Sequence, residues 1–268
     1  NVQRSKMNDN TMNISKIGKY KNVAEPFHCD INHELFMGHL GNHLLNAADF
    51  HSNDRGFGMV YLQSIKKTWV LSRLVVEMEA MPKIYDDFCV ETWVESALRY
   101  FTNRNFRIEG KNGETLGWGR SIWAMIDTDT RQPVNILDVN NGSVTEWIEA
   151  DKVNPIGKPS RAKMSKDAEF VGEYVAKYND IDINGHVNSV KSIEHVLDLF
   201  PADKYMSHCV RRFDIAYVSE CHAGDTLRFY KEEGAMADEY LVRMSKVNTD
   251  GTEIECVRAQ IMFTERNK

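Results

Sequence analysis

The chain is 268 residues long, with 42% hydrophobic and 27% charged residues, the balance of a folded protein with one large domain or two of roughly 110–150 residues. Its formal net charge of −6, without any dense run of Lys or Arg, argues against a nucleic-acid-binding protein. No apolar run reaches the roughly 20 residues that a membrane-spanning helix needs, so membrane insertion is not expected.

The polar start of the chain, Asn1–Thr11, shows no regular pattern and is left outside the predicted fold. The first regular element is a helix over Leu35–His51, in which apolar residues such as Leu40 and Leu44 recur at three- and four-residue steps. Runs with strand composition, separated by turn residues, then predict four strands. They cover Thr68–Met78, Phe88–Leu98, Thr102–Glu109 and Leu116–Ile126.

A polar stretch that contains Pro155 and Pro159 interrupts this pattern after the fourth strand. We predict a linker over residues 146–159. The second helix follows at Ser189–Phe200, and Pro201 fits its end. Four more strands are predicted after it, at Cys209–Val218, Thr226–Glu232, Glu239–Val247 and Glu255–Phe263.

The two halves resemble each other in sequence as well as in the order of their elements. Val23-Ala24 and Asp30-Ile31-Asn32 recur 152 residues later as Val175-Ala176 and Asp182-Ile183-Asn184. Duplication accounts for this better than chance does. One helix cannot cover both faces of such a sheet, so each antiparallel sheet should wrap around its helix. We predict an α+β chain of two such domains, at residues 12–145 and 160–268.

The five cysteines are scattered, and no two of them form a C-x-x-C pair. This spacing excludes a zinc knuckle and argues against a disulfide scaffold. We therefore expect reduced thiols in a cytoplasmic protein, and predict neither a metal nor a cofactor.

The segment before the second helix carries the residues best suited to chemistry. Asp182, Asn184 and His186 are spaced by two, so in an extended segment their side chains share one face. Gly185 allows a turn, and the free N–H groups that open the helix can stabilise a developing negative charge. The alternative is an Asx-rich turn that caps the helix, with His186 bonded to the backbone. The spacing alone does not decide between them.

The first half has lost part of this set. Glu34 stands where the second half has His186, and Met81-Pro82 stands where the second half has Glu220-Cys221. We therefore predict a chemically competent site in the second half and none in the first.

These residues also carry a resemblance to a known family. Asp182, Asn184, His186-Val187-Asn188 and Val190-Lys191 resemble the D-x-N-x-H-V-N-x-V-K motif of plant and bacterial acyl-ACP thioesterases, and Glu220-Cys221 resembles their later E-C pair. The first half is similar too, and the resemblance covers roughly residues 15–264. The similar segments of the first half are Trp69–Arg73, Val90–Val94, Gly113–Leu116 and Ser121–Trp123.

This resemblance implies two tandem hotdog domains, the first holding the acyl chain and the second the catalytic residues. It implies hydrolysis of fatty acyl-acyl carrier protein to free fatty acid, which ends chain elongation, with acyl carrier protein as the partner. Without a transit-like extension, a bacterial-type cytoplasmic member is expected, and a homodimer is left open. The catalytic residues that it implies are Asp182, Asn184, His186, Glu220 and Cys221.

Two mechanisms compete for these residues. In one, Glu220 or Asp182 is the base for an attacking water while Asn184 and His186 orient and polarise. In the other, Cys221 is the nucleophile and His186 and Asn184 are its partners. A neighbouring carboxylate disfavours a thiolate, and adjacent residues of a regular strand face opposite sides. The sequence therefore favours water and leaves Cys221 less certain.

Several further roles stay open. Acyl carrier protein is acidic, so a basic patch is expected, and Lys191, Arg211 and Arg212 are candidates against the alternative of an ordinary solvated face. Four tryptophans on predicted strands could line an acyl tunnel, although core packing is their commoner role. The alternative functions are an acyl-CoA thioesterase, a dehydratase and a non-catalytic acyl-binding protein, because the fold serves them all.

Overall fold

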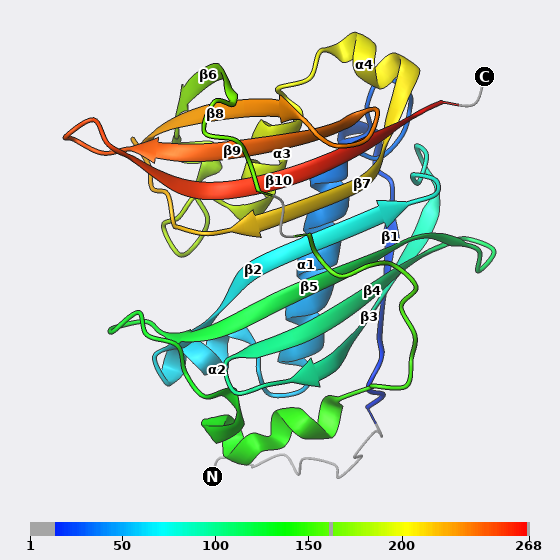
Figure 1. The fold of residues 1–268 in the computed structure, drawn as a ribbon. Helices are drawn as coiled ribbons and strands as arrows, with labels where there is room; N and C mark the ends of the chain where they lie inside the picture. The colour runs from blue at the N-terminus through cyan, green and yellow to red at the C-terminus, as the bar shows by residue number, and fades with distance from the viewer. Residues whose placement is uncertain (1–13, 161–162, 267–268) are drawn as a thin grey trace, which may run out of the picture.

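Each half of the chain begins with a short strand and passes through helices into four antiparallel strands (Figure 1). The structure, a computed structural model, describes residues 14–160 and 163–266, so Asn1–Thr11 lies outside the described residues. The first half contains β1 Gly18–Val23, α1 Met37–Asn53, α2 Met59–Ser64, β2 Lys67–Met78, β3 Asp87–Ala97, β4 Phe101–Gly110 and β5 Thr115–Asp127. The second half contains β6 Glu169–Val175, α3 Ser189–Leu197, α4 Ala202–Ser207, β7 His208–Tyr217, β8 Thr226–Glu233, β9 Glu239–Val247 and β10 Glu253–Glu265.

The eight strands predicted with bounds are all present, with ends shifted by at most two residues. The helix expected at Leu35–His51 runs from Met37 to Asn53. The helix expected to reach Phe200 ends at Leu197, because the last residues before Pro201 turn more tightly, with Phe200 N–H bonded to the Leu197 carbonyl at 3.2 Å. The six-residue helices α2 and α4 were not predicted, since they are too short to show a helical period.

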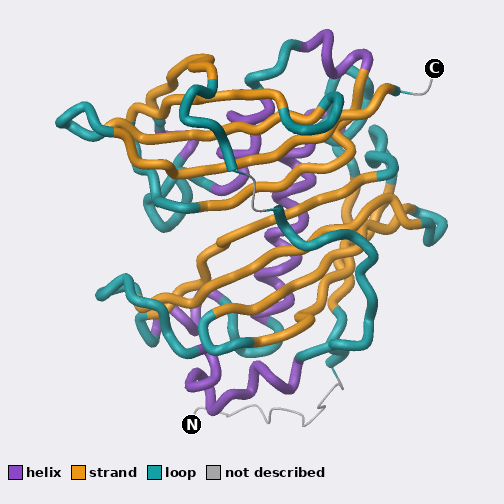
Figure 2. Tube along the Cα trace, viewed as in Figure 1, coloured by secondary structure: helices purple, strands orange, loops and turns teal. Residues whose placement is uncertain are grey.

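A single ten-stranded sheet runs through both halves, in the order β1-β3-β4-β5-β2-β7-β10-β9-β8-β6. The halves meet where β2 pairs with β7 antiparallel, in the register Arg73↔Ala216 to Glu77↔Arg212. Figure 2 shows the strands as one continuous layer with α1 and α3 behind it. The two predicted sheets are thus joined edge to edge, because each would otherwise present a row of unpaired backbone groups.

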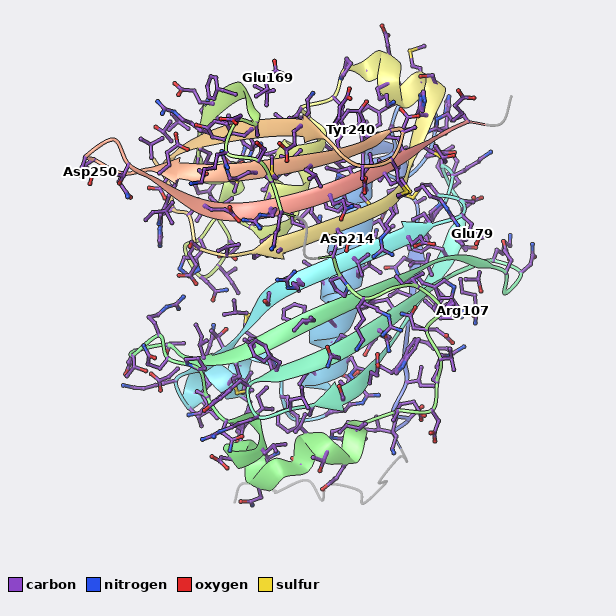
Figure 3. All side chains as sticks on the ribbon, in the orientation of Figure 1. Glu79, Arg107, Glu169, Asp214, Tyr240 and Asp250 are labelled. Carbon is purple, nitrogen blue, oxygen red and sulfur yellow. The ribbon has the colours of Figure 1, made fainter. Side chains whose placement is uncertain are left out.

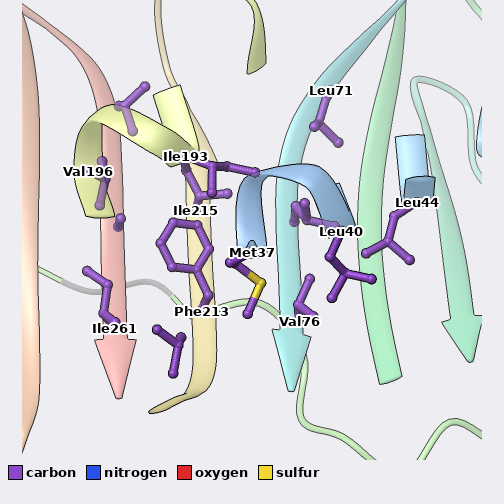
Figure 4. Packing of buried hydrophobic residues seen from close by; sticks show 14 of the residues in the cluster. Met37, Leu40, Leu44, Leu71, Val76, Ile193, Val196, Phe213, Ile215 and Ile261 are labelled. Carbon is purple, nitrogen blue, oxygen red and sulfur yellow. The ribbon is translucent and has the colours of Figure 1, made fainter. Parts of the chain in front are cut away.

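One hydrophobic core joins the two helices to both halves of this sheet (Figure 4). Leu40 and Leu44 of α1 are fully buried, and Val196 of α3 and Phe213 of β7 are buried with them. The helices approach closely at Gly41, where an added Cβ would lie 3.1 Å from Ile193 Cδ1. A larger residue there would push α1 and α3 apart.

The segment after β5 packs against the rest of the first half. The short helical segment Ile136–Trp147 buries Ile136 and Val144 against Phe57 and Leu62, in a second, smaller cluster at the end of the first half. The predicted linker then crosses the outer face of the sheet, where Asn154 Nδ2 donates to the Gly119 carbonyl at 2.8 Å. Among the described residues, no helix has the length and apolar character that a membrane span requires.

Charged side chains cover the outer face along the β2–β7 seam, where Figure 3 labels Asp214 and Glu79. Arg212 Nη1 lies 3.0 Å from Glu77 Oε2, and its Nε lies 2.8 Å from Asp214 Oδ2. Arg211 Nη2 lies 3.4 Å from Glu79 Oε1. Arg211 and Arg212 therefore form ion pairs across the junction of the two halves. These contacts give no support to the expected role of the two arginines in binding a carrier protein.

Candidate active site

The segment from Asp182 to Asn188 forms a tight turn between β6 and α3. Asp182 Oδ1 accepts the backbone N–H groups of Asn184 at 2.8 Å and His186 at 3.2 Å. Gly185 has a φ of +83°, which favours glycine. Of the two geometries that the spacing left open, the structure has the Asx turn, because the Asp182 carboxylate bonds the backbone that follows it.

The first half builds the same turn around Asp30. Its Oδ1 accepts the N–H groups of Asn32 at 2.8 Å and Glu34 at 3.1 Å. There the side chains bond to the protein itself, with Asn32 Nδ2 3.1 Å from the Tyr205 carbonyl and Glu34 Oε2 2.8 Å from Arg266 Nη1. In the second half, the amide of Asn184 is exposed. The turn is therefore a property of the repeat, and only its second copy presents free polar groups.

His186 and Glu220 meet across this turn. His186 Nε2 lies 3.4 Å from Glu220 Oε2, and both side chains are partly buried. Glu220 is also ion-paired with Arg131, which lies in the loop after β5. Nothing in the sequence connects positions 131 and 220, so Arg131 could not be predicted as part of the site. The first half thus contributes a cation to the pair in the second half.

His222 stands beside the pair, with its ring centroid 5.0 Å from that of His186. The ligand atoms of His186, Glu220 and His222 all lie within 4.8 Å of one another. Two imidazoles and a carboxylate could bind Zn²⁺. Arg131 already neutralises the carboxylate, however, so the set is a poor match for a dedicated metal site.

Cys221 joins the site through its backbone rather than its thiol. Its carbonyl accepts the Val187 N–H at 2.7 Å, and only 3% of its surface is exposed. A hydrogen bond to Cys256 and burial raise the pKa of the Cys221 thiol far above its usual range. Such a group is not a thiolate at neutral pH, and the thiolate is the nucleophilic form.

We therefore expect Cys221 to resist alkylation in the folded protein. Iodoacetamide at neutral pH should label the partly exposed Cys29, Cys89 and Cys209 first, while the buried Cys221 and Cys256 stay unmodified. Peptide mass spectrometry over a time course, with the unfolded protein as the control, measures this order. Loss of activity in step with labelling at Cys221 would contradict it.

A cavity of ≈ 1230 Å³ connects the turn to the interior of the first half. All five residues proposed from the sequence line it, namely Asp182, Asn184, His186, Glu220 and Cys221. From there its wall continues along β2 and β5, where Trp69, Leu71 and Trp123 contribute apolar surface. Trp93, in contrast, is fully buried, with Lys152 Nζ 4.9 Å from its ring centroid.

The start of α3 borders the same cavity through Ser189 and Val190. Asn188 caps this helix by accepting the Val190 N–H at 2.8 Å. Lys191 Nζ is paired with Glu194 Oε2 at 2.6 Å within the helix, so this lysine gives no support to the predicted docking patch. The cavity combines a polar mouth with an interior in which apolar side chains of β2 and β5 face polar ones of α1, which leaves room for an elongated hydrocarbon that carries one reactive polar end.

Comparisons with known proteins agree with this arrangement. The acyl-ACP thioesterase N-terminal domain matches residues 21–140, and the acyl-ACP thioesterase C-terminal domain matches residues 163–265. The dodecanoyl-[acyl-carrier-protein] hydrolase of Cinnamomum camphora is 30% identical over 197 residues, covering 70% of this chain and 52% of that protein. The palmitoyl-acyl carrier protein thioesterase of Gossypium hirsutum is 26% identical over 234 residues, covering 80% of this chain and 56% of that protein. The chain thus spans about half the length of these curated relatives.

Solved structures extend the comparison. The crystal structure of an acyl-ACP thioesterase from Bacteroides thetaiotaomicron is 48% identical with a TM-score of 0.85, and the alignment covers 93% of this chain and 98% of that one. The 12:0-ACP thioesterase of Umbellularia californica shares the fold, with a TM-score of 0.81 at 21% identity over 94% of this chain and 99% of that one.

Proposed function

This chain belongs to the acyl-ACP thioesterase family, and on that basis we propose that it hydrolyses fatty acyl-acyl carrier protein to free fatty acid and carrier thiol, ending chain elongation. The observation that carries the proposal is the cavity that joins the His186–Glu220 pair to the interior of the first half, where Trp69, Leu71 and Trp123 supply apolar surface. A thioester at its mouth would meet polar groups, while the acyl chain would extend into the first half.

In the mechanism that we propose, water adds to the thioester carbonyl carbon while Glu220 takes its proton. The C–S bond then breaks, and the proton passes to the departing sulfur. His186 lies against Glu220 and orients it, and the exposed amide of Asn184 can donate to the carbonyl oxygen as negative charge develops there.

Asp182 and Cys221 receive supporting roles in this mechanism. Asp182 Oδ1 already accepts two backbone N–H groups, so its carboxylate holds the turn that carries Asn184 and His186. The burial of Cys221 and the raised pKa of its thiol argue against a thiol nucleophile.

We propose that the two domains divide the work at the bounds expected from the sequence. Residues 12–145 would hold the acyl chain, residues 160–268 would carry the chemistry, and 146–159 would link them. Arg131 is the exception, since it reaches from the first domain to Glu220 of the second. Five free cysteines support a reducing compartment, and we propose the cytoplasm. A homodimer stays a prediction.

The test is to incubate the purified chain with saturated acyl-ACP, acyl-CoA and 3-hydroxyacyl-ACP. We expect free fatty acid and carrier thiol from acyl-ACP, detected by mass spectrometry, and slower release from acyl-CoA because the carrier contacts are missing. Loss of water from 3-hydroxyacyl-ACP without thiol release would indicate a dehydratase instead. Retained acyl ligand with no turnover would indicate a binding protein.

A further inference from the structure

The cavity crosses the inner face of the first half's sheet from strand to strand. Its lining includes Leu71 of β2, Trp123 of β5, Thr102 of β4 and Val94 of β3. The register places Leu71, Trp123 and Thr102 in one row across the sheet. Neighbouring strands lie about 4.8 Å apart, so the path from β7, beside the catalytic pair, to β4 is about 14 Å long.

Arg104 of β4 stands at the far part of this path. Its side chain is 5% exposed and belongs to the cavity wall. Nη1 donates to Thr92 Oγ1 and Nη2 donates to Ser52 Oγ, both at 3.1 Å. A guanidinium has five N–H donors. Among the ion pairs of residues 14–160 and 163–266, none includes Arg104.

The surroundings of Arg104 are polar as well. Arg55 is buried beside it and also lines the cavity, and its Nη1 donates to the His51 carbonyl at 2.8 Å. Within the described part of the chain, His51 Nδ1 and Arg55 Nε are buried without a hydrogen-bond partner. Burial and the nearby Arg55 lower the pKa of Arg104 to about 10, which leaves it charged at neutral pH. This part of the cavity wall therefore carries buried charge, and the Asp49 carboxylate, which acts electrostatically on Arg104, also lines the cavity.

The duplicated half shows that the fold itself does not require this arginine. The strand pairing allows the two halves to be aligned, because the pair Val23–Asp87 of the first half matches the pair Val175–Thr226 of the second. When the alignment is continued into the next strand of each half, Arg104 of β4 lies at the position of Tyr240 of β9. The Tyr240 ring packs 5.0 Å from Phe200 and 6.0 Å from Phe263 between their centroids. The second half fills this position with an aromatic side chain that packs against other aromatic rings, and the first half has a cation in the cavity wall there.

We infer that Arg104 is the end wall of the acyl pocket and that it makes the enzyme select medium-length chains over long ones. This inference rests on the proposed function. Each methylene group that enters the pocket before reaching Arg104 contributes favourable binding free energy, because it leaves water. A terminal methyl group pressed against the guanidinium would instead displace the remaining polar contacts of the charge and form no new ones, which is unfavourable for binding.

The experiment compares kcat/KM for a series of saturated acyl-ACPs of increasing length, using the full chain and Arg104→Met. We expect the wild-type optimum to shift to longer chains in the variant. For a chain two carbons beyond that optimum, activity relative to the optimum should rise about tenfold, the gain from burying two methylenes. Arg104→Lys is the matched control, because it keeps a cation at the wall and should keep the wild-type order.

A folded Arg104→Met with an unchanged length profile, in an enzyme that does release thiol, overturns the inference alone. If the wild type releases thiol from no acyl-ACP of any length, the proposed function fails and this inference with it. Should Arg104→Met not fold, Arg104→Gln retains donors for Thr92 and Ser52 and removes the charge. The same shift is expected for Arg104→Gln, and an unchanged profile there also overturns the inference.

Discussion

Replacing Glu220 with glutamine is expected to lower kcat by about 10²–10⁴-fold, the usual contribution of a general base. The amide matches the carboxylate in size but cannot take a proton from water. It also ends the ion pair with Arg131, which is partly exposed and so contributes little to folding. Single-turnover measurements with acyl-ACP at equal concentrations of folded protein give the rate of the chemical step directly.

Cys221→Ala is the matched comparison for that variant. It removes one buried sulfur and its hydrogen bond to Cys256, and it should retain substantial activity. A nearly inactive Cys221→Ala with a native circular dichroism spectrum, beside an active Glu220→Gln, would reverse the assignment and make the thiol the nucleophile.

Phe213→Ala should lower the free energy of unfolding by about 3–5 kcal/mol, as for other large aromatic side chains removed from cores. Phe213 is fully buried on β7 and lies opposite Val76 of β2, at the junction of the two halves. The cavity that it leaves would weaken the packing of both halves at once. Urea denaturation followed by tryptophan fluorescence measures the change.

The control for this variant is the same substitution at Phe27, whose side chain is 97% exposed. Phe27→Ala should change stability by at most about 0.5 kcal/mol. Equal losses at Phe27 and Phe213 would mean that the core at the seam does not carry the stability assigned to it.

The sequence predicts β10 well because Val257, Ala259, Ile261 and Phe263 alternate with outward-facing residues along the strand. The grouping of Glu220 and Cys221 with the Asp182 segment came from the family resemblance, and all five residues line the cavity. The geometry of the Asp182 turn stayed open at the level of the sequence, because spacing by two does not reveal that a carboxylate bonds the backbone that follows it.

Contacts between the two halves could not be predicted from local sequence patterns. The pairing of β2 with β7 leaves no mark in either strand, and Arg131 reaches Glu220 from 89 positions away. Arg104 is similar: in the sequence it is an arginine in an alternating strand, and only the closed sheet shows that it faces inward.

The seam between β2 and β7 has an evolutionary consequence. Equivalent strands of two repeats that pair antiparallel have the geometry of a two-fold symmetric dimer interface. A half-length ancestor would assemble through this edge and carry two identical catalytic centres. Once both copies are fused in one gene, selection can relax on one of them. On the proposed function, Glu34 at the position of His186 would be such a change, and it would free the first copy to specialise in holding the substrate.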